Sequence, residues 1–305
     1  MDDLLTRTTR ETPLTKWVDE ALTNNQPVDC LSLPDDSKAI RKVARDINLT
    51  SGAKLTITDM QPSGPGIAHD RAYSTNHPLW LNLPRGVSAI VDRETGQLHR
   101  VVVGVRKFGD SEERFGPLSA TAGGARRAAD ALVPLLRSRA LLDQSYAAFM
   151  TKENGEMCKV SFVRLGASAR LHCAVSSKNV TCVFVASSLS DATTDLACYT
   201  EARYSFAVEM ARAFCAIYFG LADAQQRTIT DWVCANGATL CGESISPDHQ
   251  HIQSYRDTIP SIGTIRFFCA TAFVSYERGG LTLMDPVEGV AWFQKVSTPV
   301  HTVAS

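Results

Sequence analysis

Residues 151–163 begin with Thr151-Lys152-Glu153-Asn154-Gly155-Glu156 and continue as Met157-Cys158-Lys159-Val160-Ser161-Phe162-Val163. The first part places Lys152 just before an Asn-Gly pair, a strong signal for a tight turn. The second part alternates in the way that predicts a β-strand. A lysine before such a turn can lie at the floor of a pocket, where a deprotonated amine can attack phosphorus and carry a nucleotide as a phosphoramidate. The plainer interpretation is a solvated turn lysine, so the choice depends on the rest of the chain.

The segments around this stretch predict short strands and a few helices. The expected strands are Lys54–Ile57, Val87–Val91, Leu98–Val105, Cys158–Arg164, Arg170–Ser176, Thr181–Ala186, Ala238–Cys241 and Thr264–Ser275. The expected helices are Ser37–Ile47 and the ranges 125–150, 200–221 and 224–235, the last closed by Asn236-Gly237. Gln61 to Gly66 is expected to be a loop. Because hairpin-like strands do not alternate with helices, the fold class is α+β and not a series of βαβ units.

One predicted helix carries large side chains at near-helical spacing. These are Tyr204, Phe206, Met210, Phe214 and Tyr218, which predict a buried helix face.

Composition limits the classes of function. The chain has 305 residues, 44% hydrophobic and 21% charged, with a formal net charge of −1. Such a balance provides no global basic field, so contact with nucleic acid requires a local groove. The nine cysteines contain no Cys-x-x-Cys pair, which favours reduced thiols in the cytoplasm or nucleus. Met1-Asp2-Asp3 does not resemble a secretory signal, and no apolar run is long enough for a membrane span.

The character of the chain changes near residue 81. Residues 1–80 are a polar lead-in for which the sequence predicts no function. Residues 81–305 are expected to form one domain.

Several segments, taken in chain order, resemble the nucleotidyltransferase domain of ATP-dependent RNA ligases, including the fungal-type tRNA ligases and their phage relatives. The segments are Leu83-Pro84-Arg85-Gly86-Val87, Lys107-Phe108, Lys152-Glu153-Asn154-Gly155, Ser176-Ser177-Lys178-Asn179, Leu240-Cys241-Gly242-Glu243 and Ile265-Arg266-Phe267-Phe268-Cys269-Ala270. Gly109 departs from the family's second aromatic after Lys107-Phe108. The resemblance covers about residues 83–275.

The resemblance implies a nucleotidyltransferase, ATP-grasp-like fold with mainly antiparallel sheets and flanking helices. It implies that Lys152 takes AMP from ATP and that the AMP passes to an RNA 5′-phosphate, which a 3′-hydroxyl then joins, as in RNA repair or tRNA splicing. The implied ATP-binding and phosphate-binding residues are Arg85, Lys107, Asn154, Gly155, Lys178, Glu243 and Phe268. Glu243 is the best carboxylate for Mg²⁺ or the ribose. Either Phe267 or Phe268 would stack on adenine, and Phe268 is preferred.

The C-terminal part departs from the family. Glu288-Gly289-Val290 resembles the fourth ligase motif, but Asp285 and Pro286 before it are typical of a helix start, which is the preferred interpretation. The paired lysines of the fifth motif are missing, because Lys295 is the last lysine, so the ligase-like domain at 81–305 is expected to be incomplete at its C-terminus. The alternative is therefore a degenerate ligase-fold protein that binds ATP or RNA without catalysis.

Two further alternatives concern the kind of enzyme and a metal site. DNA ligases and capping enzymes usually carry Asp at the position of Asn154, so this residue and the segment His249-Gln250-His251 favour an RNA ligase. A metal site at His249 and His251 is disfavoured, because no further ligands accompany the pair.

Overall fold

Most strands belong to one large antiparallel sheet. The computed structural model describes residues 5–7, 40–62, 84–105, 149–150, 155–166, 168–248, 259–273, 281–296, 298 and 303–304. The seven-stranded sheet has the order β1-β12-β11-β10-β7-β8-β9. Its strands are β1 (Leu5–Arg7), β12 (Leu281–Met284), β11 (Thr264–Phe273), β10 (Ala238–Ile245), β7 (Glu156–Leu165), β8 (Arg170–Ser176) and β9 (Thr181–Val185).

A second antiparallel sheet has the order β2-β3-β4-β5. Its strands are β2 (Ile40–Asn48), β3 (Lys54–Pro62), β4 (Val87–Asp92) and β5 (Leu98–Val103). A small pair joins β6 (Phe149–Met150) to β13 (Val303–Ala304). Because β3 pairs with β4, the four-stranded sheet contains residues from both sides of position 81.

Four α-helices lie in the described residues, and their ends follow from local sequence. They are α6 (Leu189–Leu196), α7 (Ser205–Phe219), α8 (Asp223–Asn236) and α9 (Pro286–Lys295), with the short 3₁₀ helix η4 (Ala202–Tyr204) before α7. The Ser188 hydroxyl accepts a hydrogen bond from the Asp191 amide at the start of α6. Gly237 ends α8 with φ of 58°, a left-handed conformation that suits glycine.

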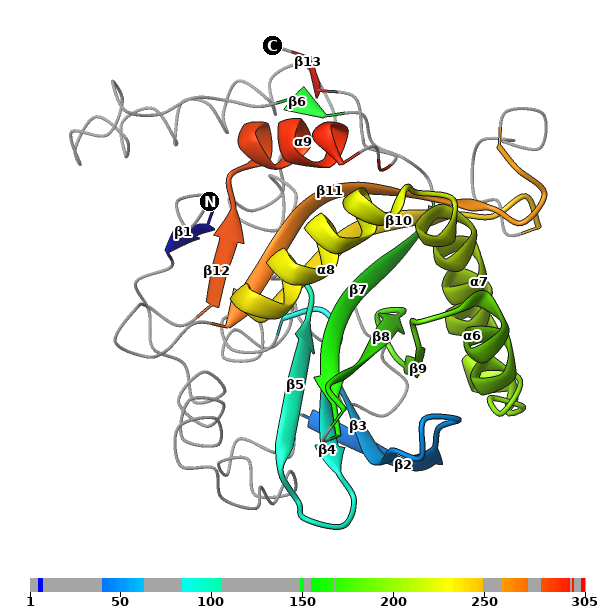
Figure 1. The fold of residues 1–305 in the computed structure, drawn as a ribbon. Coiled ribbons are helices and arrows are strands. Elements are labelled where there is room, and N and C mark those ends of the chain that lie inside the picture. The colour runs from blue at the N-terminus through cyan, green and yellow to red at the C-terminus, as the bar shows by residue number, and fades with distance from the viewer. Residues whose placement is uncertain are drawn as a thin grey trace, which may run out of the picture.

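The helices pack against one face of the seven-stranded sheet (Figure 1). Aromatic side chains fill this layer, with the Phe162 ring 6.0 Å from Phe214 and 5.4 Å from Tyr218, between ring centroids. Phe267 stacks on Phe293 of α9 at 5.4 Å. The hydrophobic core fills this layer and continues into the four-stranded sheet, since it also includes Leu55, Ile90 and Val102.

The four-stranded sheet lies against the other face of the large sheet, through β5 (Figure 1). The Thr271 hydroxyl donates to the Val103 carbonyl at 2.6 Å, and the Val103 amide donates to the Thr239 hydroxyl at 3.2 Å. These contacts join the two sheets through buried polar groups. Below, this interface is called the inter-sheet layer.

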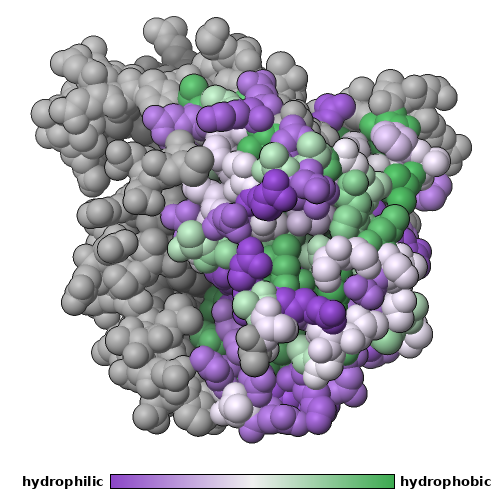
Figure 2. All heavy atoms as spheres, in the orientation of Figure 1, coloured by the Kyte–Doolittle hydropathy of each residue, from purple (hydrophilic) through white to green (hydrophobic). Residues whose placement is uncertain are grey.

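The outer surface is mixed in character. On the face drawn in Figure 2, hydrophilic and hydrophobic residues are interspersed over the helices. Among the described residues, the exposed large hydrophobic side chains are Leu189, Phe206, Ile262 and Val287. No helix in the described part of the chain is long and apolar enough to cross a membrane.

The structure confirms the α+β class and most of the predicted strands. The hairpin after Gly86 is formed by β4 and β5, and the three strands after Gly155 are β7, β8 and β9. The helices near 200–221 and 224–235 correspond to α7 and α8. The predicted helix start at Asp285 is confirmed, since its carboxylate accepts from the Val287 and Glu288 amides at 2.9 and 3.1 Å.

Several local predictions were wrong. The helix expected at Ser37–Ile47 is strand β2 from Ile40 onward, because nine residues pair with β3 and this tertiary pairing overrides helix propensity. Gln61 and Pro62 continue β3 and are not loop residues, and Phe149–Met150 is a strand and not the end of a helix. The rest of the predicted helix at 125–150 lies outside the described residues.

Two errors concern helices. Phe206 does not belong to the buried face of α7, since it is 40% exposed, whereas Met210, Phe214 and Tyr218 are buried. Helix α6 was not predicted, although Ser188 and Asp191 stand at the spacing of a capping pair.

Candidate functional site

A buried lysine marks the centre of the inter-sheet layer. Lys159 on β7 has no exposed surface, and its Nζ donates to the carbonyl oxygen of Gly86, just before β4. Gly86 has φ of +68°, and a Cβ there would lie 2.6 Å from Lys159 Nζ and 2.6 Å from the Lys178 carbonyl oxygen. Glycine is required by this close approach. Strand β7, the turn at Pro84–Gly86 and the β8–β9 turn therefore meet at one point.

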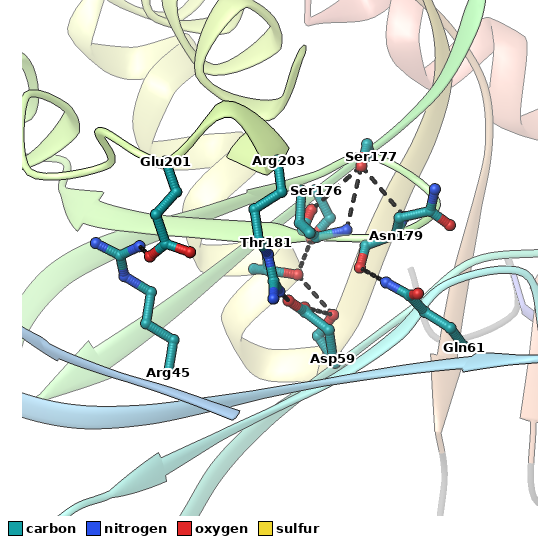
Figure 3. A network of polar contacts seen from close by, with 11 residues as sticks. Arg45, Asp59, Gln61, Ser176, Ser177, Asn179, Thr181, Glu201 and Arg203 are labelled. Atoms are coloured by element: carbon teal, nitrogen blue, oxygen red, sulfur yellow. Dashed lines mark hydrogen bonds and ion pairs between the residues drawn. The ribbon is translucent and has the colours of Figure 1, made fainter. Parts of the chain in front are cut away.

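A chain of hydroxyl groups connects the two sheets beside this point (Figure 3). The Ser88 hydroxyl donates to Asp59 Oδ1 at 2.8 Å, and the Thr181 hydroxyl donates to Ser88 Oγ at 2.6 Å. Ser176 Oγ lies 2.6 Å from Thr181 Oγ1. Arg203 Nη2 lies 3.3 Å from Asp59 Oδ2. The Asp59 carboxyl is thus buried but hydrogen-bonded on both oxygens, as buried polar groups require.

Burial shifts the pKa values of both charged groups in this layer. Desolvation raises the pKa of Asp59 above its ordinary value, and the Ser88 hydrogen bond and the charge of Lys159 act in the opposite direction. Desolvation lowers the pKa of Lys159, while Asp59 favours its charged form. Each charge therefore partly stabilises the other where water cannot. A perturbed pair of this kind marks a candidate functional site, although structural pairs share the feature.

The predicted phosphate-binding residues Arg85 and Lys178 lie on the two turns that meet at Lys159. The Arg85 amide donates to the Val105 carbonyl at 3.0 Å, which fixes the turn before β4 against the end of β5. The β8–β9 turn is held by Ser177, whose hydroxyl accepts from the Asn179 and Val180 amides at 3.2 Å each. Gln61 Nε2 donates to the Asn179 carbonyl from β3 (Figure 3). The structure therefore brings together two basic residues that are far apart in the sequence.

The third predicted motif also meets the first. The Gly155 amide donates to Glu243 Oε1 at 3.2 Å, because β10 pairs with β7 and places Glu243 opposite Met157. A Cβ on Gly155 would overlap the carbonyl oxygen of Ser244, so this position needs glycine. Lys152, Asn154 and Lys107 lie outside the described residues.

The two phenylalanines of β11 differ in environment. Phe267 is fully buried against α7 and α9, whereas Phe268 is half-buried. A β-bulge lies here, since Gly242 pairs with Phe267 and Cys241 pairs with Cys269, which leaves Phe268 as the extra residue. The simple alternation expected of the pair is therefore interrupted, and Phe267 is excluded as an adenine platform because it belongs to the core.

Glu243 is the residue predicted to bind Mg²⁺. Glu288, of the segment that resembles the fourth ligase motif, was the alternative ligand, and it lies on α9. In the ranges that the structure describes, no group of three or more His, Cys, Asp or Glu side chains could hold a metal ion. Mg²⁺ is commonly bound through one or two carboxylates together with substrate phosphates and water. Glu243 stays the residue predicted for Mg²⁺, whereas Glu288 is an exposed residue in the first turn of a helix. His249 and His251 lie outside the described residues.

The residues that sequence reasoning missed are those of the inter-sheet layer: Asp59, Ser88, Lys159, Ser176, Thr181 and Arg203. A signal existed for two of them, because Lys159 and Asp59 interrupt hydrophobic strand runs with a charge. Fully buried lysine and aspartate are rare unless paired. The hydroxyl residues carried no such signal.

Comparison of the chain with protein-family models, with curated proteins and with solved structures gives no match.

Proposed function

We propose that this protein is an ATP-dependent nucleotidyltransferase of the RNA ligase kind, with Lys152 as its nucleophile. The observation that carries the proposal is the hydrogen bond from the Gly155 amide to Glu243 Oε1, at 3.2 Å. It joins the segment that follows Lys152 to a carboxylate 88 residues further along the chain. The resemblance implies that the first and third motifs belong to one site, and this contact supports that implication.

The basic turns support the same proposal. Arg85 and Lys178 lie on turns whose backbones meet at Gly86, so both can approach one polyphosphate. Phosphoryl transfer depends on positioning and on neutralising negative charge, and two cations on rigid turns provide both. Lys107 and Asn154 are proposed for the same site from the sequence alone.

The proposed reaction has three displacements at phosphorus. The neutral Lys152 amine attacks the α-phosphorus of ATP, so that a P–N bond forms and the bond to pyrophosphate breaks. An RNA 5′-phosphate oxygen then attacks the same phosphorus and releases the lysine. A 3′-hydroxyl finally attacks the RNA 5′-phosphorus and releases AMP. Mg²⁺ would neutralise phosphate charge in these steps, and Glu243 is the residue proposed to hold it.

Lys159 and Asp59 have a supporting role in this proposal. The Lys159 amine holds the Gly86 carbonyl and so fixes the turn that carries Arg85. Both groups are buried, and Lys159 has no exposed surface, which fits a positioning residue and not a nucleophile.

The second candidate is a ligase-fold protein that binds ATP or RNA without catalysis. It is favoured by the C-terminal region, where the segment that resembles the fourth motif, Glu288-Gly289-Val290, lies in helix α9. This candidate predicts binding without a covalent product.

Incubation of the full chain with α-labelled ATP and magnesium, followed by denaturing electrophoresis and peptide mapping, tests the proposal. We expect a covalent label on Lys152 that is lost in Lys152→Ala. Lys295→Ala is the matched control, because Lys295 is exposed near the end of α9 and should leave labelling intact. Glu243→Gln should reduce the labelling rate by about 100-fold, since misplacement of the reacting groups costs that much.

Two outcomes would count against a transferase. A label that survives Lys152→Ala would remove Lys152 from the mechanism. A folded protein whose melting temperature rises with ATP, but which takes no label, would favour the binding protein.

A further inference from the structure

A cavity of about 450 Å³ lies where the ends of the two sheets meet, and its lining does not include Lys159 or Asp59. Three hairpin turns form it: the β2–β3 turn with Ser51 and Gly52, the β4–β5 turn with Glu94, and the β7–β8 turn with Ser168. His172, the third residue of β8, lies at its wall. The volume is within the range of pockets for small molecules.

The hydrogen bonds of His172 fix which ring nitrogen carries the proton. Its Nδ1 lies 2.8 Å from the Arg170 carbonyl oxygen, and a carbonyl oxygen only accepts, so Nδ1 is the protonated nitrogen. In a neutral imidazole the other nitrogen, Nε2, is then an acceptor. Nε2 lies 2.8 Å from Ser51 Oγ, so the serine hydroxyl donates to it. Burial lowers the pKa of His172, which favours the neutral ring.

This arrangement has the geometry of a nucleophile next to its general base. A hydroxyl, a base within hydrogen-bond reach and a third group that orients the base are the parts that nucleophilic catalysis needs. Here the third group is the backbone carbonyl of Arg170. Ser51 is half-buried and His172 fully buried, so the hydroxyl lies on the more accessible side of the pair.

The turn that carries Ser51 is rigidly held. Gly52 has φ of +86°, and its amide donates to the Leu49 carbonyl at 2.8 Å. The Thr50 amide donates to Asp195 Oδ1 at 2.8 Å, and the other Asp195 oxygen accepts from the Val185 amide at 2.8 Å. Asp195 thus fixes the turn from α6. A fixed turn keeps the hydroxyl at one distance from the imidazole.

The cavity is lined by charged residues of both signs, Lys54 and Arg170 together with Asp92 and Glu94. Lys54 is paired with Glu94 at 2.6 Å, and the Asp92 carboxylate accepts from the Glu94 and Thr95 amides, so these charges are satisfied locally. Arg170 lines the cavity as an exposed residue. A guanidinium at the rim suits the carboxylate product of ester hydrolysis.

We propose that Ser51 and His172 hydrolyse esters of small carboxylic acids in this cavity. Ser51 Oγ attacks the ester carbonyl carbon while His172 Nε2 takes the hydroxyl proton. The C–O bond to the alcohol breaks, and the alcohol leaves with that proton. Water then attacks the acyl-serine with His172 as base, which releases the acid and restores the serine. This activity is independent of the nucleotidyltransferase proposal.

The test uses the full chain with para-nitrophenyl acetate as substrate and an alkyl fluorophosphonate as covalent probe. We expect the probe to label Ser51, as located by peptide mapping, and Ser51→Ala to lose both the label and turnover. His172→Gln should lower turnover by about 100-fold, the usual contribution of a general base. Ser190→Ala, which changes an exposed serine of α6 outside the cavity lining, should leave both signals unchanged.

Ser51→Cys is a second variant, in case Ser51→Ala fails to fold. Its thiol at this half-buried position should still react with the probe or with iodoacetamide. Circular dichroism and melting temperature should show that each variant is folded. The proposal is overturned if the folded wild-type protein takes no probe and hydrolyses no ester. It is equally overturned if labelling persists in Ser51→Ala, or if turnover is unchanged in His172→Gln.

Discussion

The two faces of the seven-stranded sheet differ in the kinds of side chain that they bury. The face toward the helices carries aromatic side chains, such as Phe162 and Phe267, which pack without hydrogen bonds to one another. The face toward the four-stranded sheet carries Lys159, Thr239 and Thr271, which are also buried but bond to backbone or side-chain partners. Apolar burial tolerates many arrangements, whereas a buried polar group costs free energy unless its partner is in place.

The two faces of the sheet therefore have different roles. The aromatic face supplies the non-directional stability that any packed layer gives. The inter-sheet layer fixes specific turns, including those that carry Arg85 and Lys178. A protein that must position charged side chains gains from directional contacts at that place.

The largest effect on stability is expected from Phe267→Ala on the aromatic face. This residue has no exposed surface and packs against Phe293 and Phe214, so truncation should lower the free energy of unfolding by about 3–5 kcal/mol. Phe268→Ala is the matched control, because Phe268 is only half-buried and its truncation should cost less. Urea unfolding measures both, and equal losses would contradict the assignment of Phe267 to the core.

A somewhat smaller loss is expected from Lys159→Met in the inter-sheet layer. Removing one partner of a buried charge pair costs about 3–5 kcal/mol, and we expect the lower end because Arg203 still faces Asp59. The double variant Lys159→Met with Asp59→Asn should be destabilised by clearly less than the sum of the two single variants. Additive losses in urea unfolding would show that the two charges do not interact.

The same variant should change the pKa of Asp59. Lys159 lowers that pKa, so Lys159→Met should raise it further above the unfolded value. A carboxyl whose pKa is raised on folding contributes stability that is full below the unfolded pKa and is lost as pH rises through the folded pKa. The variant should therefore lose stability over a wider range between acid and neutral pH. Carbon-13 titration of the Asp59 carboxyl measures the shift, and an unchanged or lower pKa would reject the pairing.

The cap at the exposed end of a helix tests whether polar groups outside the inter-sheet layer contribute less to the free energy of unfolding. Asp285 caps α9 through two amide hydrogen bonds, so Asp285→Ala should cost about 1 kcal/mol. Asp285→Asn should retain most of the stability, because an amide oxygen also accepts at this position. Thermal unfolding measures both. A loss as large as that of Lys159→Met would contradict the idea that buried polar contacts contribute more to stability than exposed ones.

The smallest effect is expected from Arg164→Ala. Arg164 of β7 lies 3.0 Å from Asp231 of α8, but the two side chains are 45% and 64% exposed. Exposed ion pairs contribute about 0–1 kcal/mol, and salt screens them. A loss well above that range, measured in urea at low and high salt, would show that polar contacts on the helix side also determine the fold.

The sequence predicted the strands in which hydrophobic and polar residues clearly alternate. It failed where pairing with another strand determines whether a segment is extended. Strands β7, β8 and β9 follow directly from alternating hydrophobic residues. Strand β2 does not, because Arg41 to Asp46 carries mixed polarity and becomes extended only through its pairing with β3. Arg45 also packs over the rings of Tyr199 and Tyr204, contacts that no local pattern contains.

The candidate site divides in the same way. The resemblance assigned Gly155, Glu243, Arg85 and Lys178 to one nucleotide site, and that assignment stays a prediction; the structure joins Gly155 to Glu243 and brings the Arg85 turn to the Lys178 turn. The bonds of Lys159 to Gly86 and of Asp59 to Ser88 span 73 and 29 residues, so no short window could predict them. Lys152, the proposed nucleophile, stays a prediction of the sequence.

The β-bulge in β11 determines how this strand can accept insertions and deletions. Phe268 is the extra residue of the bulge and has no partner position in β10. The residues on either side of it are in register with β10, with Phe267 opposite Gly242 and Cys269 opposite Cys241. Deleting Phe268 would leave both halves in phase and simply straighten the strand. Deleting Ala270 would also remove the bulge, but Phe268 and Cys269 would then move to the positions opposite Cys241 and Leu240 and would change their environment, because side chains alternate with a period of two. A change of length in this strand is therefore least disruptive at the bulge, the position proposed to meet the nucleotide base.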